Sequence, residues 1–257
     1  MKKSDLGQHF IANEEIVKKL IELSSIKKTD RIIEIGAGKG TITSYLAEKS
    51  GKVFAFEVDK SMKKELEQIK KQNPNLEVIY NNALKYSWKE CDKIISAIPY
   101  FLSEAIIIKS IKDKVPEMIL IVGETLEDKL KENNTKIGII SNLFFDINPV
   151  LKIDARNFRP APRTNSWIVK FKRKEECSKI DGILKEIVIK NSKIKNAIIY
   201  SLIKQGYTKN KSKEILNSFN FDKNILEKQV HRITGKFLIL LRRKLGDIVD
   251  LKDNKTF

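Results

Sequence analysis

A glycine-rich loop at residues 34–40 is the segment of this chain best suited to chemistry. Its sequence, Glu-Ile-Gly-Ala-Gly-Lys-Gly, follows an apolar run at Ile32 and Ile33 and precedes a helical pattern over residues 41–49. This order predicts a strand, a tight turn and a helix. Glycine has no Cβ, so its backbone can turn sharply and lie directly against a ligand. The loop therefore predicts a ligand site, although a tight turn that holds no ligand has the same pattern.

A second predicted strand, at residues 53–56, ends in an acid, Glu57. Its distance from the loop is close to the roughly 20-residue offset at which an acid meets ribose hydroxyls. The glycines are spaced G-x-G-x-G, whereas dinucleotide-binding proteins have G-x-G-x-x-G. The spacing and the acid together favour S-adenosylmethionine over a nicotinamide cofactor, with Gly36, Gly38 and Glu57 in contact with it.

The next candidate is the loop Ala97-Ile98-Pro99-Tyr100, at the end of a predicted strand over residues 93–98. Ligands of open α/β sheets bind beyond the carboxyl ends of the strands, so this loop and the glycine loop are expected to face one crevice. Proline fixes the backbone, and an exposed aromatic ring beside it can stack on a planar base. The alternative is a strand-ending turn with Tyr100 packed in the core.

The elements that must position these loops alternate between strand and helix. Short apolar runs separated by helical patterns predict a buried parallel sheet; they lie at residues 31–35, 53–56, 76–80, 93–98 and 118–122. Residues 139–147 and 166–171 are predicted as two further strands with no helix between them. They would form an antiparallel hairpin at the edge of the sheet. After a charged break at residues 172–179, only helical patterns remain.

Composition narrows the class of protein. The formal net charge of the 257 residues is +17 and the sequence pI is about 9.6, which favours a polyanionic partner, although a lysine-biased composition has the same effect. Two cysteines and two histidines are too few for a disulfide framework or a structural metal site. No apolar run reaches the length of a membrane span, and residues 1–5 lack the apolar core of a signal peptide. We therefore expect a cytoplasmic protein without a metal.

Several segments stand in the order and spacing of one family's motifs: Leu6–Phe10 (L-G-Q-[HN]-F), Glu34–Gly40 (E-I-G-x-G-x-G), Glu57–Asp59 (E-x-D), Asn82–Leu84 (D-A-L), Ala97–Tyr100 (N-[LI]-P-[YF]), Phe158–Ser166 (F-x-P-x-P-x-V-x-S) and Lys193–Ile198 (a basic segment). On these motifs the chain resembles the ribosomal RNA adenine dimethyltransferases, over residues 6–198. These enzymes methylate adenine N6 in small-subunit RNA, and close relatives act on the large subunit.

The resemblance implies a Rossmann-like class I methyltransferase fold: a mostly parallel seven-stranded sheet with an antiparallel edge hairpin. It implies a methyltransferase domain at residues 1–174 and a helical, basic, RNA-binding domain at residues 178–257, in a monomer that acts on small-subunit ribosomal RNA or a pre-ribosomal particle. The residues it assigns to S-adenosylmethionine are His9, Ile11, Gly36, Gly38, Glu57, Asn82 and Ala97. The residues it assigns to catalysis are Ala97, Ile98, Pro99 and Tyr100.

Two positions depart from the family pattern: Asn82 replaces an acid, and Ala97 replaces the catalytic asparagine. An amide can still bond the cofactor's amino group through its carbonyl. Ala97 offers no acceptor to the target amine, and losing one preorganised polar contact typically lowers a rate roughly 10²–10³-fold. We therefore expect a slow methyltransferase. Two alternatives stay open: an RNA-binding assembly or transcription factor with this fold, and a large-subunit methylase.

Overall fold

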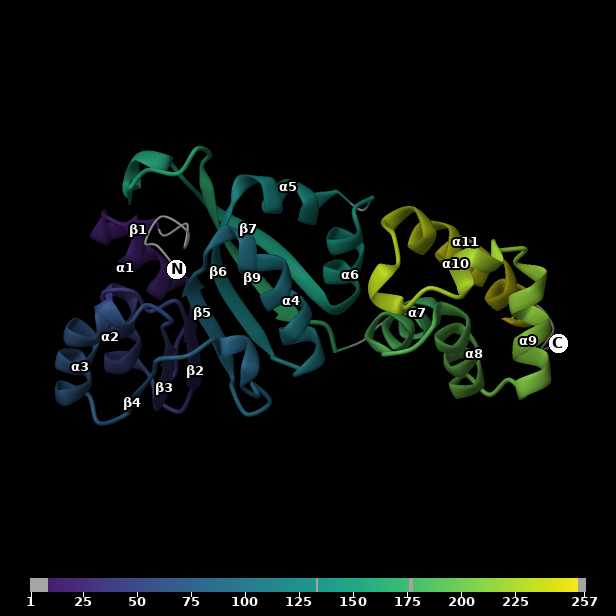
Figure 1. Cartoon of the computed structure of the whole chain (residues 1–257), viewed down its shortest axis with the longest axis horizontal. Helices are drawn as coiled ribbons and strands as arrows, with labels where there is room; N and C mark the ends of the chain where they lie inside the picture. Colours follow the sequence, from purple (N-terminus) through teal and green to yellow (C-terminus); the bar gives the residue numbers. More distant parts are fainter. Residues whose placement is uncertain (1–8, 133, 176–177, 254–257) are drawn as a thin grey trace. The chain divides into compact units, whose positions relative to one another are not determined.

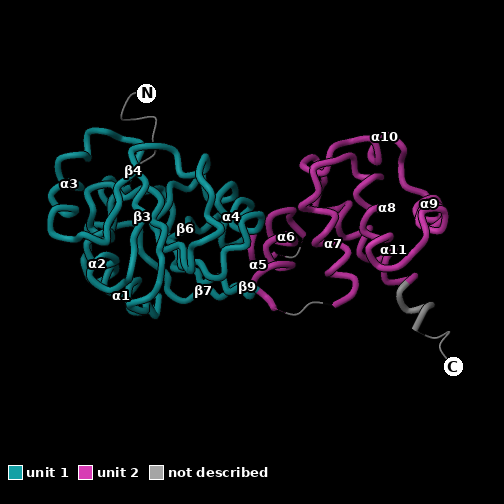
Figure 2. Tube along the Cα trace, turned by 90° about the horizontal axis from the view of Figure 1, so that it is seen from below, with its two compact units in different colours: residues 1–128, 146–173 teal, residues 129–145, 174–257 magenta. Residues whose placement is uncertain are grey.

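The computed structural model describes residues 9–132, 134–175 and 178–253, the last five of these by their backbone alone. The chain divides into two compact units, each considered by itself below. Unit 1 comprises Met1–Asp128 and Asp146–Arg173, and unit 2 comprises Lys129–Phe145 and Lys174–Phe257 (Figures 1 and 2). The expected division between residues 174 and 178 differs from these units in one segment, because residues 129–145 group with the C-terminal helices.

Unit 1 is built on a seven-stranded sheet (Figure 1). Its strands, in spatial order, are β4 (Leu76–Ile79), β3 (Lys52–Phe56), β2 (Arg31–Ile35), β5 (Lys93–Ala97), β6 (Glu117–Gly123), β9 (Ser166–Arg173) and β7 (Phe145–Ile153). The pairs from β4 to β6 are all parallel, and β9 runs antiparallel to β6. The predicted fold, a mostly parallel sheet with two late strands at one edge, is confirmed.

Helices and short turns connect the strands of unit 1. They are α1 (Glu14–Leu23), α2 (Thr41–Lys49), η2 (Lys60–Met62), α3 (Lys63–Gln72), η3 (Ala83–Lys85), η4 (Tyr100–Leu102), α4 (Ser103–Lys112), α5 (Glu124–Lys131), which continues into unit 2, and η5 (Ala155–Asn157). A separate two-stranded sheet pairs β1 (Phe10–Ile11) with β8 (Phe158–Arg159), antiparallel. This pairing ties the segment around His9 to the connection before β9.

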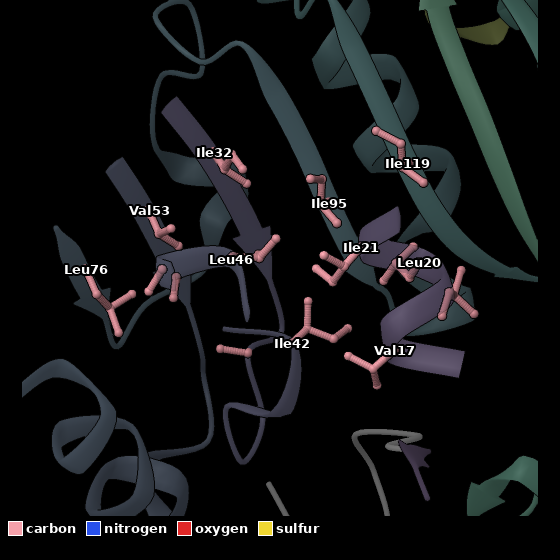
Figure 3. Packing of buried hydrophobic residues seen from close by; sticks show 14 of the residues in the cluster. Val17, Leu20, Ile21, Ile32, Ile42, Leu46, Val53, Leu76, Ile95 and Ile119 are labelled. Carbon is pink, nitrogen blue, oxygen red and sulfur yellow. The ribbon is translucent and has the colours of Figure 1, made fainter. Parts of the chain in front are cut away.

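The central strands of the sheet, β2, β5 and β6, are buried on both faces. On one face, Ile32, Val53, Leu76, Ile95 and Ile119 of adjacent strands pack against α1 and α2 (Figure 3). Side chains of successive strand residues point to opposite faces. The intervening residues Ile33, Ile94, Met118 and Leu120 are buried as well. Burial on both faces explains why these strands are continuous apolar runs in the sequence.

Helix α1 begins at a capping residue, Asn13. The side chain of Asn13 accepts a hydrogen bond from the Glu15 backbone N–H, and Glu14 and Glu15 occupy the first turn. A side-chain oxygen at this position satisfies a backbone donor that the helix itself leaves unpaired. Val17, Leu20 and Ile21 are buried in the core cluster, so α1 is packed against the sheet.

The predicted strand at residues 139–147 is wrong for most of its length. Residues Lys136–Phe144 form helix α6, and β7 begins only at Phe145. Thr135 caps the helix by accepting a hydrogen bond from Gly138 N–H, and almost the whole of α6 is buried. A helix that is apolar on all sides shows no amphipathic period, so its sequence cannot be told from a buried strand. Pro149 fits β7, because this strand lies at the edge of the sheet.

Unit 2 is helical. Beyond α6 it contains α7 (Lys179–Ile189), α8 (Ile194–Lys204), α9 (Lys209–Ser218), α10 (Lys223–Leu226), η6 (Val230–Arg232) and α11 (Gly235–Asp253). Its own core includes Leu184, Ile198, Leu202, Leu238 and Leu241, each at most 1% exposed. In the part of the chain that the structure describes, no helix combines the length and the apolar character needed to cross a membrane.

Candidate functional site

A cavity lies in unit 1 at the carboxyl ends of β2, β3 and β5. The cavity brings together nearly all of the residues predicted from the sequence: His9, Gly36, Gly38, Glu57, Asn82, Ala97, Ile98, Pro99 and Tyr100. Ile11 is the exception, since it pairs with Phe158 in the small sheet, packs against the core and does not line the cavity. Leu6, Gly7 and Gln8 of the first motif lie outside the described residues.

The glycine loop adopts a backbone that other residues rarely take. The φ angles of Gly36, Gly38 and Gly40 are 80°, 56° and 85°, in the left-handed region. The N–H groups of Gly36 and Ala37 both donate to the Phe56 carbonyl, at 2.8 and 3.0 Å. A Cβ on Gly38 would lie 3.0 Å from the Phe10 ring. The loop is thus locked to β3 and pressed close to the chain segment that carries His9.

Glu57 is held by the backbone around it. Its side chain is buried, and its Oε2 accepts from Gly38 N–H at 2.8 Å. Its Oε1 accepts from the N–H groups of Val58 and Asp59, both at 2.7 Å. A carboxylate has about four acceptor positions, so these three donors fix its orientation and leave one position for a ligand hydroxyl. Beside it, the apolar side chain of Val58 lines the cavity and is 53% exposed.

A second acid, Glu34, lies behind the loop on β2. It is buried, and Thr43 Oγ1 donates to its Oε2 at 2.6 Å. The pKa of Glu34 is raised to about 8, mainly by burial; the Thr43 hydrogen bond opposes this rise and the charge of Glu57 adds to it. Glu34 is therefore mainly protonated at neutral pH, which leaves Glu57 as the carboxylate of the loop region.

Asn82 serves as the cap of η3. Its Oδ1 accepts from Leu84 N–H at 2.9 Å, while its own backbone N–H donates to the Asn81 side chain at 2.8 Å. With Oδ1 engaged, the Nδ2 donors of Asn82 remain available to a ligand, which an acid at this position could not offer. Asn81 also lines the cavity. Sequence reasoning missed it, although two adjacent asparagines after a strand are a usable signal.

Tyr100 is half-buried, so it is neither a fully exposed ring nor a core residue, the two alternatives that its sequence left open. Its hydroxyl forms a hydrogen bond of 2.7 Å with Ser166 Oγ. Its ring lies against Gly123, where a Cβ would come within 3.2 Å of it. The His9 ring is stacked on it, with centroids 5.9 Å apart and planes at 25°. Burial raises the pKa of the Tyr100 hydroxyl. The contacts with Ser166 and Gly123 hold the ring in place.

Phe101 is the exposed aromatic residue of this loop. It lines the cavity and is 65% exposed, more than any other large hydrophobic residue whose exposure the structure describes. Sequence reasoning assigned stacking to Tyr100 and passed over its neighbour. An unpartnered aromatic ring at the rim of a cavity indicates a surface on which a planar group can stack.

These features define a class of protein. A glycine loop and an acid that suit a nucleoside, a Pro-Tyr loop, and the sheet order with an antiparallel strand beside β6 together describe a Rossmann-like methyltransferase.

Comparisons with known proteins give the particular family. Residues 1–235 match the family described as "Ribosomal RNA adenine dimethylase". The chain is 30% identical to a Methanococcus aeolicus protein named "Probable ribosomal RNA small subunit methyltransferase A", over 95% of this chain and 97% of that protein. It is 28% identical to the Fusobacterium nucleatum "Ribosomal RNA small subunit methyltransferase A", over 93% and 96%. The chain belongs to the ribosomal RNA adenine dimethylase family, as its motifs predict.

Solved structures agree on the fold. A dimethyladenosine transferase from Plasmodium falciparum is similar with a TM-score of 0.64 and 23% identity, covering 91% of this chain and 96% of that one. The 23S rRNA methyltransferase ErmE is similar with a TM-score of 0.61 and 18% identity, covering 92% and 99%.

Proposed function

We propose that this protein transfers methyl groups from S-adenosylmethionine to N6 of adenines in small-subunit ribosomal RNA, forming dimethyladenine. The observation that carries the proposal is the single cavity that joins a nucleoside site to an aromatic loop. One half of it, formed by Gly36, Gly38, Glu57 and Asn82, is called the nucleoside half. The other half, formed by His9, Ala97, Pro99, Tyr100 and Phe101, is called the target half. We further propose that the protein acts as a monomer in the cytoplasm.

The nucleoside half has the groups that the cofactor requires. The remaining acceptor position of Glu57 suits a ribose hydroxyl, and the exposed side chain of Val58 suits the face of an adenine ring. Asn82 can donate to a ring nitrogen. A Cβ on Gly36 would come no nearer than 3.8 Å to Pro99, so the glycine leaves space in the cavity wall. Bound S-adenosylmethionine supplies a methyl group on a positively charged sulfur that leaves as a neutral thioether.

The target half can hold a base that has left its stack. Enzymes that modify a base extrude it into a pocket and hold it between aromatic or apolar side chains. Tyr100 is fixed by Ser166 and Gly123, so it offers a rigid ring without losing rotamer freedom when the base arrives. Phe101 at the rim can stack on the target or on its neighbour. Positioning of this kind supplies much of the rate of a transfer to a poor nucleophile.

Unit 2 supplies positive charge for RNA phosphates. Lys193 and Lys195 of the basic motif both pair with Glu227, and these two contacts lower the pKa of Glu227 to about 2. Other basic side chains of unit 2 are exposed and make no ion pair to any residue that the structure describes: Lys209, Lys213, Lys223, Lys228, Arg232 and Arg243. Phosphate contacts release counterions, so we expect affinity for ribosomal RNA to fall steeply with salt.

The experiment is transfer of a labelled methyl group to small-subunit particles. Particles from cells that lack the modification are incubated with the protein and labelled cofactor, and their adenines are analysed by mass spectrometry. We expect N6-methylated adenines at specific positions in small-subunit RNA, and none when large-subunit particles are used. Methylation of large-subunit RNA alone would contradict the proposed target.

A second candidate function rests on Ala97. Without an acceptor at this position the protein could bind and guide ribosome assembly without catalysis. In that case wild-type protein would bind particles and cofactor product but transfer no label. The two candidates therefore differ in one measurable quantity, the single-turnover rate.

A further inference from the structure

Unit 2 carries a group of exposed apolar side chains on α7 and α8, two helices that pack against one another (Figure 1). Ile189, Tyr200 and Ile203 are 42%, 36% and 41% exposed. In the described part of unit 2, Ile239 on α11 is the other large hydrophobic residue with comparable exposure, 46%. Scattered exposed apolar residues are ordinary, whereas a group bordered by polar side chains indicates a surface that binds another molecule.

Two contacts join these exposed residues into one surface. Lys204 of α8 forms an ion pair of 3.0 Å with Glu186 of α7. Lys190, directly after α7, places its Nζ 3.5 Å from the centroid of the Tyr200 ring. Glu186 is one turn before the exposed isoleucine of α7, Tyr200 is one turn before that of α8, and residues one turn apart share a helix face. This surface is called the α7–α8 patch, and it consists of Glu186, Ile189, Lys190, Tyr200, Ile203 and Lys204.

The polar border of the α7–α8 patch is positively charged. Its acid, Glu186, is paired with Lys204, whereas no ion pair engages Lys190 within the residues that the structure describes. The Lys204 ammonium group also lies 5.4 Å from the centroid of the Tyr200 ring, so this ring has two cations beside it. A carboxylate from another molecule would pair with Lys190 and weaken the repulsion between the two cations.

The composition of the patch distinguishes among three candidate occupants. Two copies of this chain would bring lysines against lysines, and the net charge of +17 on each copy opposes their association. Nucleic acids are bound at their phosphates by cations and polar groups, and at their bases by aromatic rings. Isoleucines offer neither contact, and Lys190 already lies over the Tyr200 ring. Protein interfaces have an apolar centre rich in aromatic residues and a polar rim, which matches the composition of the patch.

We propose that the α7–α8 patch binds a protein of the small-subunit particle. The bound segment of that protein covers Ile189 and Ile203 with apolar side chains and places carboxylates beside Lys190 and Lys204. Small-subunit particles are the substrate under the proposed function, on which this assignment rests. The patch then adds affinity for the particle that protein-free RNA does not give, alongside the phosphate contacts of the other basic residues of unit 2.

Photochemical crosslinking identifies what covers the patch. Ile203→benzoylphenylalanine introduces a photoreactive group into the patch, and illuminated complexes with purified small-subunit particles are analysed by mass spectrometry. We expect crosslinks to a ribosomal protein, at a segment in which apolar residues are flanked by aspartate or glutamate. Crosslinks to RNA, to a second copy of the chain, or to a protein segment without carboxylates would overturn the proposal. The same group in place of Ile239 on α11 is the control and should not crosslink to that segment.

Binding measurements test the patch without a crosslinker. The double variant Ile189→Ser, Ile203→Ser removes both isoleucines, and we expect its affinity for particles to fall at least about tenfold, as for central residues of an interface. Its affinity for RNA extracted from the same particles should stay within about twofold of wild type. Ile239→Ser removes an isoleucine of similar exposure outside the patch and should bind both as wild type does. Every replaced residue is exposed, so the urea midpoints of these variants should stay close to that of wild type.

Lys190→Gln separates a carboxylate partner from a phosphate partner. We expect its affinity for particles to fall about two- to fivefold, the scale of an exposed ion pair. With extracted RNA the salt dependence of its affinity should match that of wild type, whereas loss of a phosphate contact lowers the slope by about 1. A lower slope on RNA, or an equal loss of affinity for RNA and particles in the double-serine variant, would assign the patch to RNA and overturn the proposal.

These binding measurements do not depend on turnover. If particles are bound through the patch but wild-type protein transfers no methyl group to them, the proposed function fails and the assignment of the patch stands. If particles are methylated but the double-serine variant binds them as tightly as wild type does, the assignment of the patch fails and the proposed function stands.

Discussion

In the nucleoside half of the cavity, backbone N–H groups hold the polar side chain of Glu57 in place. The target half is formed mainly by aromatic rings. Three N–H donors orient Glu57, and the loop that supplies one of them is locked by two hydrogen bonds to Phe56. In the target half, Ala97 has lost a polar group, Tyr100 is held by one hydroxyl contact, and Phe101 is exposed. Such a difference teaches that cofactor binding and base positioning can change independently, because they depend on different kinds of contact.

The largest expected effect comes from restoring the side chain at position 97. Ala97→Asn adds an acceptor for the N6 amine, so single-turnover methylation should rise by about one to three decades, the reverse of losing one preorganised contact. Affinity for S-adenosylhomocysteine should stay within about tenfold. Ala97→Leu is the matched control, because it fills the same space without a polar atom and should not raise the rate. An unchanged rate in Ala97→Asn would show that the target half does not depend on this acceptor.

The next effect tests the nucleoside half. Glu57→Ala removes the carboxylate that suits the ribose and leaves the N–H groups of Gly38, Val58 and Asp59 without their partner. We expect binding of S-adenosylmethionine to weaken by about 1.5–3 kcal/mol, the scale of hydrogen bonds to a charged group. Glu48→Ala, an exposed acid on α2, is the control. Calorimetry measures the affinity of both variants. Equal affinity in wild type and Glu57→Ala would contradict the assignment of Glu57 to the cofactor's ribose.

Much of the fold was predictable from local sequence because burial leaves a pattern there. The apolar runs around Ile32, Val53 and Ile95 mark strands buried on both faces, and Asn13 marks the start of α1. Helix α6 was missed because its burial on all sides erases the helical period. Its neighbours in unit 2 determine this burial, and they are distant in the sequence.

The site was predictable to the extent that each residue acts through its own chemistry. Glu57 and Gly38 follow from residue type and spacing, yet their mutual hydrogen bond depends on how β3 and the loop fold together. The hydrogen bond between His9 Nδ1 and the Pro160 carbonyl joins two distant segments that the β1–β8 pair brings together. Ile11 was assigned to the cofactor by the family resemblance alone, but it pairs within β1 and packs against the core instead.

A smaller effect is expected at Phe101. Base–aromatic stacking contributes roughly 1–3 kcal/mol per base, so Phe101→Ala should weaken binding of ribosomal RNA by about that amount. Phe101→Tyr keeps an aromatic ring, so its affinity for ribosomal RNA should stay close to that of wild type. Cofactor affinity should not change, since the ring belongs to the target half. Filter binding at several salt concentrations separates this loss from phosphate contacts, which alone change the salt slope. An altered slope would assign Phe101 to folding of the loop rather than to the base.

The smallest effect concerns Glu34, behind the nucleoside half. Burial raises its pKa to about 8 in the folded protein, whereas an unfolded glutamate titrates near its ordinary value. Between these two values the folded state binds more protons than the unfolded state, so the free energy of unfolding must fall as pH rises through this window. The slope contributed by this group is at most about 1.4 kcal/mol per pH unit, and it vanishes above the folded pKa. Glu34→Gln removes the titration and keeps an oxygen that can accept from Thr43. We expect urea unfolding of Glu34→Gln to be less dependent on pH between about 5 and 8 than that of wild type.

Glu48→Gln, the same change at an exposed position of α2, should follow wild type. Because Glu57 also raises the pKa of Glu34, Glu57→Gln should reduce the slope as well, which couples the carboxylate that faces the ligand to the one buried behind it. Curves for Glu34→Gln and wild type that run parallel over this range would mean that Glu34 is ionised in the folded protein, and that the nucleoside half carries two negative charges instead of one.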